Sequence, residues 1–150
     1  MEWSWNNELK SMPTRAELSK GAEHKSEHTP LMIAALEGDM KMVKNVLTLR
    51  EAINAKDNEG HTALMFAVIN SHTEIVKALL RVGARVNARA HDGGTALMLA
   101  ATNGDAEITR ILLNNGAKTG YRYTSTGKTA VSLAADRGHT EVVQLLEKRT

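Results

Sequence analysis

The chain carries a motif that returns at a nearly fixed interval. A threonine opens the motif at Thr29, Thr62, Thr95 and Thr129, which gives spacings of 33, 33 and 34 residues. The seven residues that begin at these threonines read TPLMIAA, TALMFAV, TALMLAA and TAVSLAA. A period of this length is typical of a stacked solenoid, in which no single unit can bury its own apolar face. A solenoid offers a partner an extended surface rather than a pocket.

The second unit shows what one repeat contains. Thr62 is a suitable helix N-cap, because its side-chain oxygen can accept a bond from an amide of the first turn. Two apolar stripes at helical spacing follow, separated by the break at 70–72: Leu64, Ala67, Val68, Ile75, Val76, Leu79 and Leu80. Gly83 would end the second helix. The turn-rich stretch 84–94 is too short for a further helix, so each unit is predicted to be helix, turn, helix and projecting loop.

These residues resemble the ankyrin repeat. The resemblance is carried by the motif Thr-Pro-Leu-x-x-Ala-Ala at residue 29, followed by Gly38, Asp39, Val43, Leu47, Asn54, Asp57, Gly60 and Thr62. It recurs in phase over residues 29–150 and implies an all-α solenoid of antiparallel helix pairs with hairpin fingers along one edge. We expect repeats at 29–61, 62–94 and 95–128, with a C-terminal capping repeat at 129–150.

Several positions depart from the family pattern. The family usually has histidine at the fourth motif position, where this chain has Met32, Met65, Met98 and Ser132. Ser71 stands where the other repeats have glycine, namely Gly38, Gly104 and Gly138. If the backbone at Ser71 is left-handed, the serine is strained by roughly 1 kcal/mol. In the fingers, Ala90 replaces the aspartate seen at Asp57, and Gly120 replaces the asparagine seen at Asn54 and Asn87.

The first 28 residues form a separate segment with four Lys/Arg and five Asp/Glu. Trp3, Trp5, Leu9 and Met12 could cover the open apolar end of the stack, and residues 18–21 could be a degenerate finger. We therefore expect residues 1–28 to be an N-terminal cap, since an uncapped end would expose apolar surface. The alternative interpretation is a docking segment for a partner.

Composition limits the function classes. The net charge of +2 provides no global field for nucleic acid, and the absence of cysteine excludes disulfides, thiolate metal sites and a cysteine nucleophile. The N-terminus lacks the pattern of a signal peptide, and no apolar run approaches membrane length. We expect a monomeric cytoplasmic protein that binds neither nucleic acid nor membrane.

Two patterns suggest chemistry but have simpler interpretations. The sequence Gly127-Lys128-Thr129 resembles the end of a phosphate-binding loop, but Arg122 stands where that loop needs glycine. His28 and His61 share one repeat phase and could in principle bind a metal, yet no carboxylate or cysteine joins them at ligand spacing in the sequence. His72 and His139 recur at the start of a second helix, where the family often has histidine. We therefore expect no metal, no cofactor and no enzymatic activity.

The resemblance implies a non-enzymatic module that binds another protein through its fingertips and the concave face of its first helices. A cluster of basic residues around the second and third fingers suggests that the partner carries an acidic segment: Arg81, Arg85, Arg89, Lys118, Arg122 and Lys128. The alternative is an engineered or structural scaffold without an evolved partner. The expected contact residues are Lys56, Asn58, Glu59, His61, Ile69, Asn70, Arg89, His91, Asp92, Thr102, Asn103, Arg122, Tyr123, Thr124, Lys128, Asp136 and Arg137.

The third finger has two open interpretations. It is one residue longer than the others and contains both tyrosines of the chain, Tyr121 and Tyr123, beside Arg122. Tyrosine and arginine are enriched among the residues that dominate interface energies. The alternative is that a tyrosine folds down to cover the last repeat.

Overall fold

The computed structural model describes residues 28–48 and 52–149. Their eight helices form four antiparallel pairs. The pairs are α3 (Pro30–Glu37) with α4 (Met40–Thr48), α5 (Ala63–Ile69) with α6 (Thr73–Arg81), α7 (Ala96–Asn103) with α8 (Ala106–Asn114), and α9 (Ala130–Asp136) with α10 (Thr140–Glu147). The all-α solenoid is confirmed. Trp3, Trp5, Leu9, Met12 and residues 18–21 lie outside the described residues.

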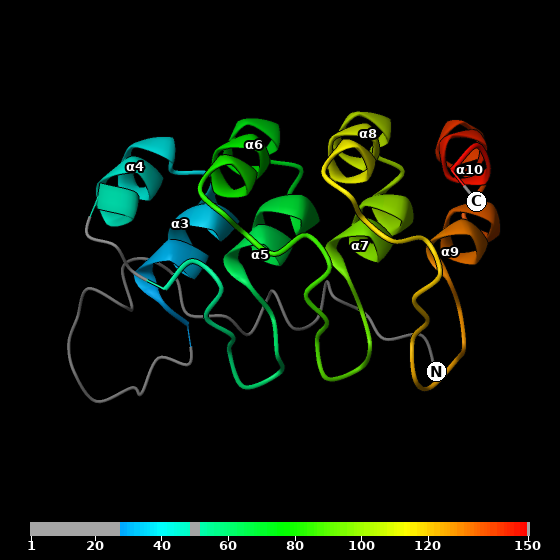
Figure 1. The fold of residues 1–150 in the computed structure, drawn as a ribbon, viewed down its shortest axis with the longest axis horizontal. Coiled ribbons are helices and arrows are strands. Elements are labelled where there is room, and N and C mark those ends of the chain that lie inside the picture. Colours follow the sequence, from blue (N-terminus) through cyan, green and yellow to red (C-terminus); the bar gives the residue numbers. More distant parts are fainter. Residues whose placement is uncertain (1–27, 49–51, 150) are drawn as a thin grey trace.

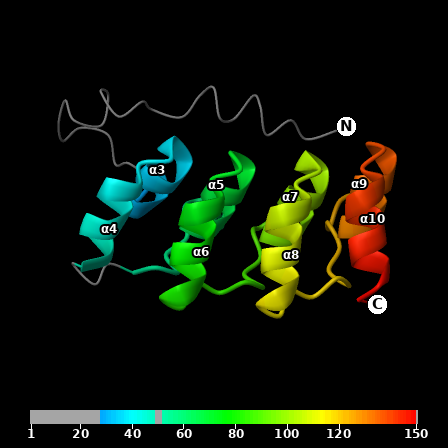
Figure 2. The same cartoon turned by 90° about the horizontal axis from the view of Figure 1, so that it is seen from above.

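The four pairs stand side by side in one row (Figures 1 and 2). The first helices α3, α5, α7 and α9 pack on one another to form the inner layer, and the second helices α4, α6, α8 and α10 form the outer layer. The loops that follow α4, α6 and α8 project as fingers along the edge of the inner layer (Figure 1). No helix among the described residues has the length and apolar character that a membrane crossing requires.

The motif threonines cap the first helices. The side-chain oxygens of Thr29, Thr62, Thr95 and Thr129 accept a bond from the amide three residues on, at 3.2 to 3.4 Å. At both ends of the stack the third residue returns the bond: Met32 Sδ accepts from Thr29 N–H at 3.4 Å, and Ser132 Oγ accepts from Thr129 N–H at 2.8 Å. At Met32 the thioether thus accepts this bond at the position where the family usually has histidine, although sulfur is a weak acceptor.

Glycine ends the second helix as predicted. Gly83 has a φ of 101° and donates to Leu80 O, while Ala84 donates to Leu79 O. This pair of bonds is the Schellman motif, which satisfies carbonyls that the helix end would leave without partners. The left-handed backbone turns the chain out of α6 and into the second finger.

The core lies between neighbouring repeats. Eight apolar residues of the second and third repeats line this core and are all at most 6 % exposed: Leu64, Ala67, Val76, Leu79, Leu97, Ala100, Leu112 and Leu113. Ala34, Ala67, Ala100 and Ala134 share one repeat phase and are fully buried. A small side chain at this position lets successive inner helices approach closely, which explains why alanine recurs in the motif.

Candidate partner-binding surface

The three fingers are held in register by backbone bonds. Each finger closes on itself as a hairpin, as where Asp57 N–H donates to His61 O at 3.0 Å. Neighbouring fingers are then joined, because His91 N–H donates to Glu59 O and Thr124 N–H donates to Asp92 O, both at 2.9 Å. The fingertips therefore form a connected edge rather than three independent loops (Figure 1).

Long cations strengthen these joints. Lys56 Nζ donates to Arg89 O at 2.9 Å, and Arg89 Nη2 donates to Arg122 O at 3.1 Å, in each case one finger further along. Lys56, Arg89 and Arg122 are nevertheless exposed. These predicted contact residues thus have a structural role in addition to any contact with a partner.

Asparagine fixes the base of each of the first two fingers. Asn54 Oδ1 accepts from Arg85 N–H at 2.7 Å, and Asn54 Nδ2 donates to Gly83 O at 3.1 Å. Asn87 makes the same bonds with Lys118 N–H and Gly116 O at 2.8 and 3.0 Å. The equivalent residue of the third finger, Gly120, has no side-chain amide and makes no such bonds.

The predicted inner-face residues lie at the C-terminal ends of the first helices. Asn70 and Asn103 are exposed, and their amides donate to carbonyls of the preceding repeat, Leu36 O at 2.8 Å and Ile69 O at 2.9 Å. Thr102 is half-buried and bonds within its own helix to Met98 O. These ends of the inner helices therefore present polar groups that hydrogen bonds already orient.

His72 and His139 have structural roles, in agreement with the sequence interpretation. Their Nε2 atoms lie 3.0 Å from Leu36 O and 3.1 Å from Thr102 O of the preceding repeat. Each ring also covers a glycine, since a Cβ built on Gly38 or Gly104 would lie 2.5 Å from it. These contacts tie each second-helix N-terminus to the end of the previous first helix.

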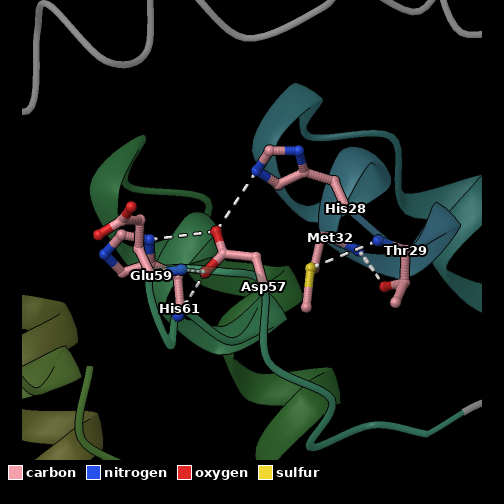
Figure 3. A network of polar contacts seen from close by, with 6 residues as sticks. All are labelled: His28, Thr29, Met32, Asp57, Glu59 and His61. Carbon is pink, nitrogen blue, oxygen red and sulfur yellow. Dashed lines mark hydrogen bonds and ion pairs between the residues drawn. The ribbon is translucent and has the colours of Figure 1, made fainter. Parts of the chain in front are cut away.

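A buried polar network lies under the first finger (Figure 3). Asp57 Oδ2 is 3.2 Å from His61 Nδ1 and 3.4 Å from His28 Nε2, while Asp57 Oδ1 accepts from the amides of Glu59 and His61 at 2.9 and 2.7 Å. Both histidine rings also meet the Phe66 ring edge-on, at centroid distances of 5.5 and 5.8 Å. The network connects the first finger to the start of α3.

Two sequence interpretations are wrong at this network. His61 was expected on the partner-facing finger, but it is only 2 % exposed and belongs to the core, because Asp57 and Phe66 hold its ring inward. A carboxylate does join His28 and His61, since the hairpin returns Asp57 to them. The sequence feature that could have indicated this contact is the spacing of four residues from Asp57 to His61, which a hairpin turn brings together. No group of ligands able to hold a metal ion occurs within the described ranges.

Asp57 is strongly biased toward its charged form. Burial raises the pKa of its carboxyl, but hydrogen bonds from His28 and His61 outweigh burial and hold the pKa well below its usual range. Asp57 thus acts as a permanent acceptor for the amides of the finger turn. Ala90, the equivalent residue of the second finger, cannot do this, and there Asp92 Oδ1 accepts from Gly94 N–H at 2.8 Å instead.

In the third finger the two tyrosines face the second finger. The Arg89 guanidinium lies 4.9 Å from the centroid of the Tyr121 ring. A Cβ on Gly94 would lie 2.9 Å from Tyr123 Cε1, so this ring packs on the second finger. Both tyrosines are half-buried, whereas Arg122 and Thr124 are exposed. The tyrosines therefore stabilise the finger stack, and these contacts are with the second finger rather than with the last repeat, which the alternative interpretation expected.

The other predicted contact residues are at the surface. Asn58, Glu59, His91, Asp136 and Arg137 are exposed. Ile69, Asp92 and Lys128 are half-buried, and Lys128 Nζ is paired with Asp136 Oδ2 at 2.7 Å. The fingertip and inner-face residues thus line one side of the stack, with His61 as the exception.

Comparison with known proteins agrees with this geometry. A family model described as ankyrin repeats in three copies matches residues 9–90 and 86–149. Comparison with curated proteins gave no match. The two matched stretches meet inside the second finger, so the family pattern runs without a gap across all four helix pairs.

Proposed function

The chain belongs to the ankyrin-repeat family, and from that premise we propose that it binds a protein partner through its fingertips and the exposed ends of its inner helices. Ankyrin repeats are generally protein–protein interaction modules, and the family is generally non-enzymatic. The proposal extends this general role to particular residues of the fingers and the concave face.

The observation that supports the surface is its pre-organisation. Backbone bonds between fingers and asparagine bonds at their bases hold the tips in fixed positions, while Asn58, Glu59 and His91 remain exposed. A surface that is already ordered loses little conformational entropy when a partner docks, so more of the contact energy becomes affinity. The partner would bury the tips together with Asn70 and Asn103.

The test is a comparative capture experiment from cell lysate. The tip variant carries Glu59→Ala and His91→Ala, because both residues are exposed and only their backbones hydrogen-bond the neighbouring finger, although the His91 ring also lies against Gly60. The control variant carries Lys41→Ala and Gln144→Ala, two exposed changes on the outer helices. We expect one protein to be retained by the wild type and the control and lost by the tip variant. A protein retained equally by all three, or by none, would contradict the proposal.

A further inference from the structure

Cations on the outer layer of the stack are of two kinds. On the outer faces of α6 and α8 they are paired: Lys77 Nζ lies 3.1 Å from Glu74 and 3.9 Å from Glu107, and Arg110 is paired with Glu141 across the next repeat. From α6 to α10 this face therefore supplies counter-ions for its own cations, whereas Lys41 and Lys44 on α4 have no ion pair within the described residues.

The cations at the C-terminal ends of the second helices and at the bases of the fingers have no such ion pairs in the part of the chain that the structure describes. Arg81 is the last residue of α6, Lys148 follows α10, and Arg85 and Lys118 occupy the same position at the bases of the second and third fingers. All four are exposed, and none of their side chains forms an ion pair or hydrogen bond with the described residues. We call these four residues the finger-base edge. The second helices point the same way, so their C-terminal ends lie along one side of the row (Figure 2).

Hydrogen bonds fix the backbone at the finger-base edge. Asn54 and Asn87 hold the backbones of Arg85 and Lys118 through bonds of 2.7 and 2.8 Å. Arg149 Nη2 donates to Asn114 Oδ1 at 2.8 Å, which ties the end of α10 beside Lys148 to the end of α8. The charges are thus presented at positions set by the repeat spacing.

We propose that the finger-base edge docks an extended acidic segment of the protein partner. This inference rests on the proposed protein-binding function and adds a second contact surface to it. Packed helices lie about 8–10 Å apart and an extended chain rises about 3.3 Å per residue, so each repeat spans about three residues of such a segment. A run of aspartate and glutamate offers a carboxylate to every cation at that spacing. A nucleic acid fits less well, because the described tyrosines pack between fingers and leave no aromatic ring at the edge for base stacking.

The experiment measures binding of a fluorescein-labelled poly-glutamate peptide by fluorescence anisotropy at low salt, where exposed charges are least screened. The edge variant carries Arg85→Ala and Lys118→Ala. The control variant carries Lys41→Ala and Lys44→Ala, which removes the same charge from two exposed cations of α4 that also have no partner among the described residues. We expect the edge variant to raise the Kd by about three- to tenfold and the control to change it by less than about twofold. Circular dichroism melts check that both variants stay folded.

Three outcomes would overturn the inference. They are no measurable binding to the wild type, an equal loss in both variants, and an oligothymidylate of equal charge that binds as tightly as the peptide. The tip variant, Glu59→Ala with His91→Ala, separates this inference from the proposed function and is expected to bind the peptide like the wild type. If the tip variant loses the lysate partner and the edge variant binds the peptide normally, the function stands and the edge proposal fails.

Discussion

The imidazole ring of His72 lies against the backbone of Gly38 in the preceding repeat. A Cβ on Gly38 would stand 2.5 Å from His72 Cε1, and His72 Nε2 lies 3.0 Å from Leu36 O, two residues before the glycine. His139 repeats this arrangement on Gly104. Opposite Ser71 the equivalent residue of the next repeat is Asp105, which instead caps its own helix by accepting from Ile108 N–H at 2.9 Å. Among the first three repeats, glycine at the turn between the two helices therefore occurs in the two repeats, at Gly38 and Gly104, where a histidine of the next repeat covers it.

Ser71→Gly should be neutral or stabilising by up to about 1 kcal/mol. Ser71 has a φ of 55° and is the one non-glycine residue of the described chain with a positive φ, so its Cβ is strained. No side-chain bond caps α6, so the hydroxyl has no capping role to lose there. Urea unfolding of the two proteins measures the difference. A clear loss of stability in the glycine variant would show that the strain argument is wrong.

Gly38→Ala should destabilise the protein by more than about 1 kcal/mol. The left-handed backbone at φ 77° strains any Cβ, and this Cβ must also displace the His72 ring. A double-mutant cycle with His72→Ala separates the two causes. If the histidine contact matters, the cost of Gly38→Ala will be smaller in the His72→Ala background. Equal costs in both backgrounds would leave backbone strain as the sole effect.

Leu97→Ala should cost about 2–5 kcal/mol of unfolding free energy. Leu97 is 1 % exposed between α7 and its neighbours, so the truncation leaves a cavity that the stack cannot fill. Val82→Ala is the matched control, because Val82 is 44 % exposed and its truncation opens no cavity. Chemical denaturation should show a lower midpoint for Leu97→Ala alone.

Asp57→Asn should reduce stability at neutral pH by about 1–3 kcal/mol, because the amide cannot replace a charged acceptor for both histidines. The folded pKa of Asp57 is lowered from its ordinary value of 3.8, so its ionised form stabilises the fold fully above that value. This contribution is lost as pH falls below 3.8 toward the folded pKa. The difference between wild type and variant should therefore narrow in acid. Unfolding curves recorded from neutral pH down to about pH 3 test this, and a constant difference would contradict it.

Tyr123→Ala and Arg122→Ala should separate stability from binding. The Tyr123 ring packs on Gly94, so its removal should lower the melting temperature and loosen the third finger. Arg122 is exposed and its side chain bonds only within its own finger, to Gly127 O at 3.0 Å, while the bond from Arg89 goes to its backbone carbonyl, so the alanine variant should leave stability nearly unchanged. Partner affinity should fall by more than about 1 kcal/mol in Arg122→Ala if this residue is an interface hot spot. Thermal melts and titration with the captured partner measure the two effects.

The amino-acid sequence by itself determined the repeat, the threonine caps, the glycine that ends α6 and the buried stripe of the core. Each of these depends on local spacing: a capping threonine bonds an amide three residues away, and the stripe follows from helical periodicity. A period of 33 residues then aligns equivalent residues of neighbouring units, and Ser71 could be identified as strained from that alignment alone.

Tertiary structure alone decided which polar residues of the fingers are buried and which are free. His61 looks like a fingertip residue in the sequence, but the hairpin brings Asp57 back under it and the ring enters the core. Arg89 and Lys56 bond to carbonyls one repeat away, whereas Arg85 and Lys118 have no such contact. These differences depend on side-chain direction and on distances between atoms far apart in the chain, which the residue types of one repeat do not encode.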